Sequence, residues 1–208
     1  MIKFDNISVK ADKKFILKNF SLIINEFDKV LIYGKSGLGK TTLFRLIMGF
    51  VTPCVGDMYY KGKRIDKNTV WEIRKSTAYV PQNLDLTDEK VKTYINDLLS
   101  LKVNTEKNIS EKEITQLFDY FELPPDTQDK NYKDLSGGEK QRVAIIMAIL
   151  LDRELFLLDE VTSALSGELK QKVIDYFAKI PEKTVVIISH DVEWMQNQNI
   201  KKISMEEL

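Results

Sequence analysis

The residues with the clearest capacity for chemistry form a glycine-rich loop. They are Gly34, Lys35, Ser36, Gly37, Leu38, Gly39, Lys40 and Thr41, with Thr42 directly after them. Glycines let the backbone turn so tightly that successive N–H groups point inward, and the N-terminus of a following helix adds its positive dipole end. In this G-x-x-x-x-G-K-T pattern the lysine would reach the β- and γ-phosphates of a nucleotide, and the threonine hydroxyl would bind Mg²⁺. The loop therefore predicts a site for a nucleoside triphosphate.

Two carboxylates follow an apolar run farther along the chain. Asp159 and Glu160 come directly after Leu155–Leu158, which is typical of a buried parallel strand. Side chains at the carboxyl end of such a strand lie where open α/β folds bind ligands. Asp159 could hold Mg²⁺ through water, and Glu160 could orient and deprotonate the water that attacks the γ-phosphate. Taken alone, the pair could equally be a solvated acidic strand end.

A third motif, Leu135–Arg142, reads Leu-Ser-Gly-Gly-Glu-Lys-Gln-Arg. Ser136 suits the start of a helix, because its hydroxyl can cap the first free N–H groups. A capped helix explains Ser136 but not the whole string. Ser136, Gly137 and Gly138 also offer a hydroxyl, open backbone N–H groups and a helix dipole, which together suit contact with a phosphate.

The order and spacing of these three motifs resemble ATP-binding cassette (ABC) proteins. The resemblance implies ATP and Mg²⁺ as cofactors and a homodimer in which the segment at Ser136 closes over the γ-phosphate of ATP held by the opposite subunit. Gln82 matches the family's Q-loop, which touches Mg²⁺ and the attacking water. His190, the only histidine of the chain, matches the switch histidine that contacts the γ-phosphate.

The resemblance also implies the fold, an α/β P-loop NTPase of ABC type. We expect one domain over residues 1–208, with a RecA-like core sheet, an N-terminal antiparallel β-subdomain and a helical subdomain inserted at roughly 84–150. The sequence patterns fit: they predict strands at Ile2–Val9, Phe15–Ile24 and Lys29–Tyr33, and a helix from Lys40 that stops at Gly49.

Further elements follow from apolar spacing. Residues 51–65 are typical of a hairpin, and two helices are expected within the polar stretch between Gln82 and Leu135. Ser136 is expected to begin a long helix that is buried on every side at Val143–Leu151. Leu155–Leu158 and Val185–Ile188 are expected to be parallel strands covered on both faces.

Composition limits the partners and the location. The 208 residues include 31 Lys and Arg against 31 Asp and Glu, so there is no net basic charge and no nucleic-acid partner is expected. Cys54 is the single cysteine, which excludes an internal disulfide and fits a reducing compartment. The longest apolar run, Val143–Leu151, is far shorter than the about 20 residues of a membrane-spanning helix. The resemblance to ABC proteins adds the setting: it implies a cytoplasmic protein, peripheral on the inner face of the cell membrane, beneath a separately encoded integral membrane permease.

Two departures from the usual family pattern bear on function. The aromatic residue that stacks on adenine is expected near Ala11 and is missing there, so either Phe15 replaces it or base stacking is lost. Ser166 stands where the family usually has an aspartate that helps to couple the two nucleotide sites. Cooperativity between the sites is therefore in question.

The function expected from the resemblance is that of the ATP-hydrolysing subunit of an ABC transporter. The run Asp159–Leu165 and the stretch Phe121–Pro124 further resemble ATPase subunits of Fet-type iron exporters. A DNA-maintenance ABC ATPase would need a long coiled coil for which Gln82–Ser136 is too short, and a translation-linked ABC protein normally carries two cassettes. A regulatory cassette that binds ATP without hydrolysing it stays open because of Ala11 and Ser166.

Overall fold

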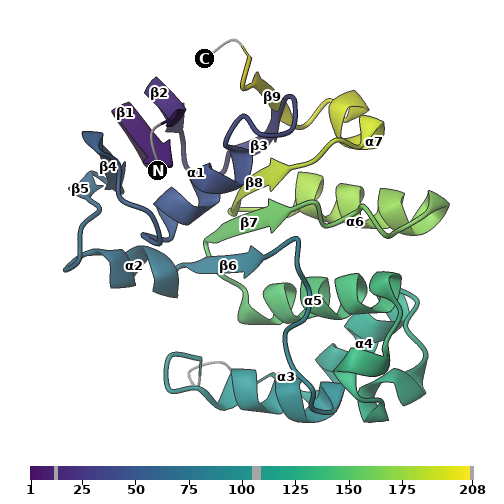
Figure 1. The fold of residues 1–208 in the computed structure, drawn as a ribbon. Coiled ribbons are helices and arrows are strands. Elements are labelled where there is room, and N and C mark those ends of the chain that lie inside the picture. The colour runs from purple at the N-terminus through teal and green to yellow at the C-terminus, as the bar shows by residue number, and fades with distance from the viewer. Residues whose placement is uncertain (12–13, 105–108, 207–208) are drawn as a thin grey trace.

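The computed structural model describes residues 1–11, 14–104 and 109–206, and this part of the chain contains two β-sheets with helices between and beside them (Figure 1). One sheet is antiparallel, with strand order β2-β1-β4-β5. Its strands are β1 (Ile2–Ala11), β2 (Lys14–Ile24), β4 (Val55–Tyr60) and β5 (Lys63–Arg64). The other sheet has the order β6-β7-β8-β3-β9, and all of its neighbouring strands run parallel. These strands are β6 (Thr77–Val80), β7 (Leu155–Asp159), β8 (Thr184–Ile188), β3 (Lys29–Tyr33) and β9 (Lys201–Ser204).

The parallel sheet is covered on both faces, as its apolar runs predict. Every residue of β7 and of β8 is buried. Because successive side chains of a strand point to opposite faces, Val30 and Ile32 pack in the core between the two sheets, whereas Leu31 packs in the core on the other side.

Helix α1 (Lys40–Ile47) lies in the core between the two sheets. Leu43 and Phe44 are fully buried there with Phe4 of β1. The helix stops where the sequence predicts: Gly49 has a φ of +66°, and a Cβ at this position would lie 2.4 Å from a methyl carbon of Val70. This packing fixes the N-terminus of α1 beside the carboxyl end of β3.

Helices α5 (Gly137–Leu151) and α6 (Gly167–Lys179) pack in the core on the opposite face of the parallel sheet. Outside α5 lie α3 (Val91–Ser100), α4 (Glu111–Tyr120) and two short 3₁₀ helices, η1 (Pro125–Asp129) and η2 (Tyr132–Asp134) (Figure 1). Both predicted helices of the polar stretch are therefore present. The limits 84–150 expected for the helical subdomain include α5, which packs against α3 and α4 and also against β6.

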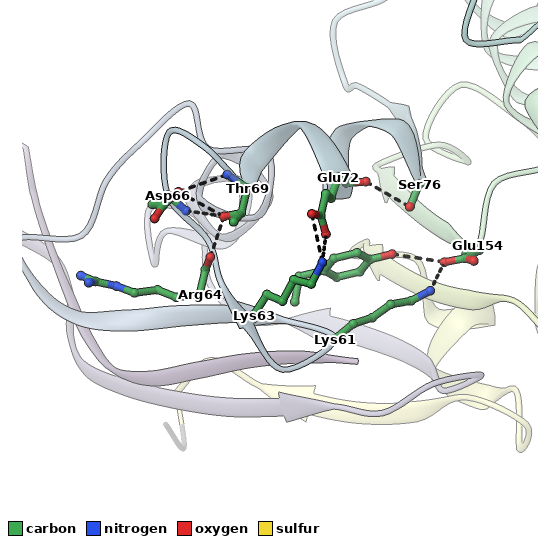
Figure 2. Close-up of polar contacts among 9 residues, drawn as sticks. Lys61, Lys63, Arg64, Asp66, Thr69, Glu72, Ser76 and Glu154 are labelled. Carbon is green, nitrogen blue, oxygen red and sulfur yellow. Dashed lines mark hydrogen bonds and ion pairs between the residues drawn. The ribbon is translucent and has the colours of Figure 1, made fainter.

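A group of polar contacts joins the antiparallel sheet to the amino end of β7 (Figure 2). Glu154, just before β7, accepts hydrogen bonds from Lys61 at 2.6 Å and from the Tyr60 hydroxyl at 3.3 Å. Lys63 of β5 pairs with Glu72 of α2 (Val70–Lys75) at 2.9 Å. The two contacts to Glu154 hold the starting end of β7, the strand whose far end carries Asp159.

Candidate nucleotide site

The glycine-rich loop connects β3 to α1 at the carboxyl edge of the parallel sheet. Gly34, Gly37 and Gly39 have φ values of +142°, +86° and +85°, which side-chain-bearing residues rarely adopt. Gly39 is also sterically required, because a Cβ there would lie 2.7 Å from Cγ2 of Ile16. Gly39 has no side chain to cap α1, so the first N–H groups of the helix are available to an anion.

Lys40 is held inside this loop. Its ammonium donates to the carbonyl oxygens of Gly34 at 2.7 Å and Lys35 at 2.9 Å, and only 7% of the residue is exposed. Lys35 and Ser36 are exposed, whereas Leu38, Thr41 and Thr42 are half-buried. The two carbonyls therefore hold the ammonium inside the loop before any nucleotide is present. A bound phosphate would compete with these carbonyls for the ammonium.

Asp159 ends β7 as a buried carboxylate, 1% exposed, and neither of its oxygens has a hydrogen-bond partner among the described residues. Burial raises the pKa of this carboxyl to about 6, although the nearby Thr41 hydroxyl and the Lys40 ammonium favour the ionised form. Two unsatisfied oxygens beside a threonine hydroxyl suit a hydrated Mg²⁺, which prefers oxygen ligands and is usually held by one or two carboxylates together with substrate phosphates. These residues therefore fit the predicted metal role.

Glu160 and His190 face each other from neighbouring strands. The Glu160 backbone N–H donates to the Ile188 carbonyl at 2.8 Å, and Glu160 Oε1 lies 3.7 Å from His190 Nε2. Glu160 has a φ of +54°, a strained conformation of the kind that gathers at functional sites. Burial raises the pKa of its carboxyl, with His190 acting in the opposite direction. A glutamate with a raised pKa is suited to accept a proton near neutral pH.

Gln82 and Phe15 are two further residues predicted for the site, and they come from separate segments of the chain. Gln82 is exposed and follows β6, whose Val80 pairs with Leu158, so it leaves the sheet at the same edge as Asp159. Phe15 lies opposite Lys10 on the antiparallel sheet, with the Lys10 ammonium 4.5 Å from the centre of its ring. The next residue, Ile16, is the one that contacts Gly39. Stacking of adenine on Phe15 stays a prediction, and Ile16 is the nearer apolar surface to the loop.

The third motif begins α5 as the sequence predicts. Ser136 is the N-cap: its hydroxyl accepts from the Glu139 N–H at 3.3 Å and donates to the Glu139 carboxylate at 2.7 Å. Ser136 and Gly137 are exposed and Gly138 is half-buried. This helix end thus offers a hydroxyl and backbone N–H groups at the surface.

Gln141 is a residue of the site that the motif analysis did not single out. It is 4% exposed, and its amide donates to the Glu160 carbonyl at 3.1 Å and to the Ser163 hydroxyl at 2.9 Å. Its side-chain oxygen accepts from the Ala164 N–H at 3.0 Å. The helix that begins at Ser136 is therefore bonded directly to the turn that carries Glu160. Because Gln141 stands between Lys140 and Arg142 in the polar first turns of α5, its burial was not visible from the local sequence.

Comparisons with known proteins agree with this geometry. The sequence profile of the ABC transporter family matches residues 17–163. The energy-coupling factor transporter ATP-binding protein EcfA1 of Mycoplasmopsis synoviae is 32% identical over 93% of this chain and 75% of its own length. The molybdate/tungstate import ATP-binding protein WtpC of Methanocaldococcus jannaschii is 35% identical over 92% of this chain and 63% of its own length.

A solved structure is also similar. The dimeric ATP-binding cassette MJ0796, bound to ADP and Pi in a post-hydrolysis state, superposes with a TM-score of 0.80 at 27% identity, covering 93% of this chain and 90% of that one. The match supports the expected fold, ATP binding and ATPase activity. The names of these relatives give no support to iron export, so the resemblance to Fet-type subunits stands unsupported. The chain belongs to the ABC transporter family, as an ATP-binding cassette with the α/β P-loop fold that hydrolyses ATP.

Proposed function

We propose that this chain is the ATPase subunit of an ABC transporter, forms a homodimer around two ATP molecules and drives a separately encoded membrane permease. The observation that carries the proposal is the meeting of three strand ends. The carboxyl ends of β3, β7 and β8 bring the phosphate loop, the Asp159–Glu160 pair and His190 to one edge of the sheet. Phosphate binding and water activation can therefore occur side by side.

Each side chain at this edge has a distinct role in hydrolysis. Lys40 and the N–H groups of the loop bind the β- and γ-phosphates, while Thr41, Asp159 and Gln82 would hold Mg²⁺, which when bound would supply neutralisation of the charge on the transferred phosphoryl group. Glu160 accepts a proton from the water whose oxygen attacks the γ-phosphorus, as the bond to the β-phosphate oxygen breaks. His190, 3.7 Å from Glu160, orients that carboxylate and reaches the γ-phosphate.

The dimer supplies the second half of each nucleotide site. Ser136, Gly137 and Gly138 would contact the γ-phosphate of ATP held by the other subunit, since Ser136 and Gly137 are exposed at the start of α5 and a helix N-terminus attracts anions. The dimeric state of the similar cassette MJ0796 supports this arrangement.

Glu139→Gln is expected to tighten the ATP-dependent dimer by roughly two- to tenfold, because like charges brought together at an interface oppose association. Hydrogen bonds from the Ser136 hydroxyl and N–H lower the pKa of the Glu139 carboxyl, so it is ionised next to the hydroxyl that must meet a phosphate. Glutamine keeps the capping contact, so thermal stability should change little. Analytical ultracentrifugation with ATP and EDTA measures the effect. Glu168→Gln, an exposed acid near the start of α6, is the control, and an equal shift in both variants would contradict the local explanation.

A membrane partner is proposed because transport needs a path across the bilayer, and within the described residues no helix has the length and apolar character to form one. The exposed surface at Gln82 and the exposed side of residues 84–100 would receive a cytoplasmic loop of the permease. Asn96→Arg puts charge on that side. It should abolish the coupling of transport to ATP hydrolysis in the permease complex and spare basal ATPase of the chain alone. Full transport by the variant complex would show that the surface is misassigned.

The decisive experiment for the proposed function is Mg²⁺-dependent ATPase activity of the purified chain, with its oligomeric state followed after addition of ATP. Hydrolysis with transient dimers supports a transport ATPase. ATP-dependent dimers without hydrolysis, either alone or with the permease, would overturn the assignment as a transport ATPase.

A further inference from the structure

A chain of buried and partly buried polar contacts joins the segment after Glu160 to the segment after His190. The Trp194 indole N–H donates to the Thr162 hydroxyl at 2.8 Å, and that hydroxyl donates to Asp191 Oδ2 at 2.6 Å. The other oxygen of Asp191 accepts from the Lys170 ammonium at 3.0 Å. Trp194 and Thr162 are fully buried. We name these four residues the Asp191 network.

The network is well shielded from water. The side chains of Lys170 and Asp191 are 15% and 20% exposed, so salt and solvent weaken their attraction less than that of a surface pair. Glu193 adds a second carboxylate 3.6 Å from the ammonium. Burial disfavours the charged lysine, but these carboxylates outweigh it and raise the pKa of Lys170. Removing one of these charges would leave its partner partly buried and incompletely paired, and an uncompensated charge of this kind destabilises the folded state.

The position of the network links it to the two water-activating groups. Thr162 lies two residues after Glu160, and Asp191 directly follows His190. The Asp191 N–H also donates to the buried Ser189 hydroxyl at 3.1 Å, which shapes the backbone on both sides of His190. The His190 side chain is itself 55% exposed, so packing alone does not fix it. Its place opposite Glu160 therefore depends on how its backbone is anchored.

We propose that Lys170 and Asp191 are positioning residues for ATP hydrolysis, which hold the His190 segment in register with the turn that carries Glu160. The inference rests on the proposed roles of Glu160 and His190. The Asp191 network consists of residues from the Glu160 turn, α6 and the start of α7 (Val192–Gln196), and no residue of the phosphate loop takes part in its bonds. Its loss should therefore slow turnover without weakening nucleotide binding.

The test compares Lys170→Met with Lys172→Met. Lys172 is on the same helix and pairs with Glu122, which takes no part in the Asp191 network. Lys172→Met therefore also removes a lysine charge and an ion pair from α6. We expect Lys170→Met to lower kcat about tenfold, since small displacements of catalytic groups cost up to about 100-fold, with unchanged Kd for ATP. Lys172→Met should keep parental kcat, and Lys170→Arg should restore most of it. Asp191→Asn, which is nearly isosteric, provides a second variant if Lys170→Met does not fold.

A double-mutant cycle separates positioning from general destabilisation. In a His190→Ala background, Lys170→Met should lower kcat no further, because residues that act through one another are not additive. A full additional tenfold loss there would overturn the proposal, as would a parallel loss of ATP affinity or a kcat equal to that of Lys172→Met. If the parent protein fails to hydrolyse ATP with its permease present, the proposed function itself is wrong. That result differs from the three outcomes above, which all require an active parent.

Discussion

Glu160→Gln is expected to reduce ATP turnover by roughly 100- to 1000-fold, the loss typical of deleting one preorganised catalytic group. Glutamine has nearly the shape of glutamate, so the strained turn at φ +54° and the backbone bond to Ile188 should persist. It cannot accept a proton from the attacking water. The phosphate loop is unchanged, and ATP should bind and close the dimer but not be cleaved.

The measurement is single-turnover hydrolysis together with light scattering during gel filtration. We expect the variant to accumulate as an ATP-bound dimer while the parent returns to monomer as ATP is consumed. Glu168→Gln serves again as the control, because it removes an exposed carboxylate from the neighbouring helix without touching the site. If Glu160→Gln turns over ATP at the parental rate, another group must accept the proton of the attacking water. If neither parent nor variant dimerises with ATP, the proposed homodimer is wrong.

The sequence predicts the parts of this molecule that depend on local pattern. Four-residue apolar runs identify β7 and β8, because parallel strands covered on both faces have no polar side to show. The glycines and Lys40 identify the phosphate loop, and Ser136 identifies the start of α5, since each depends on residues within one turn of chain. Helix α6 was not predicted, although Val173, Ile174 and Phe177 have helical spacing and are fully buried.

Contacts between distant segments could not be predicted in this way. Gln141 lies 19 residues from Glu160, and Lys170 lies 21 residues from Asp191, so neither partner is visible from spacing. The position of Phe15 could not be predicted for a different, local reason. The pairing of β1 with β2 shifts register between Val9 and Lys10, which turns Phe15 towards Lys10 and leaves Ile16 against Gly39. A single irregularity exchanges the faces of neighbouring residues.

Asp159→Asn is expected to stabilise the metal-free protein while it abolishes Mg²⁺-dependent hydrolysis. The folded pKa of about 6 lies above the unfolded value of 3.8, because burial disfavours the ionised carboxylate. The folded state therefore binds this proton more tightly, so the contribution of Asp159 is favourable at low pH and is lost as pH rises through about 6. The shift corresponds to about 3 kcal/mol, or a rise in Tm of about 6–12 °C for the asparagine variant above that pH.

Thermal unfolding in EDTA, measured from about pH 4.5 to about pH 7.5, should show the gain of Asp159→Asn over the parent growing with pH and then levelling off. Asp97→Asn, an exposed substitution on α3, should show no such trend. Adding Mg²⁺ and ATP should reverse the order, because only the parent retains the carboxylate for the ion. Equal stability of parent and variant at high pH would mean that Asp159 is partnered or hydrated when ionised. A variant more stable without Mg²⁺ and inactive with it would show that the buried charge serves the metal at the expense of the fold, as residues at functional sites often do.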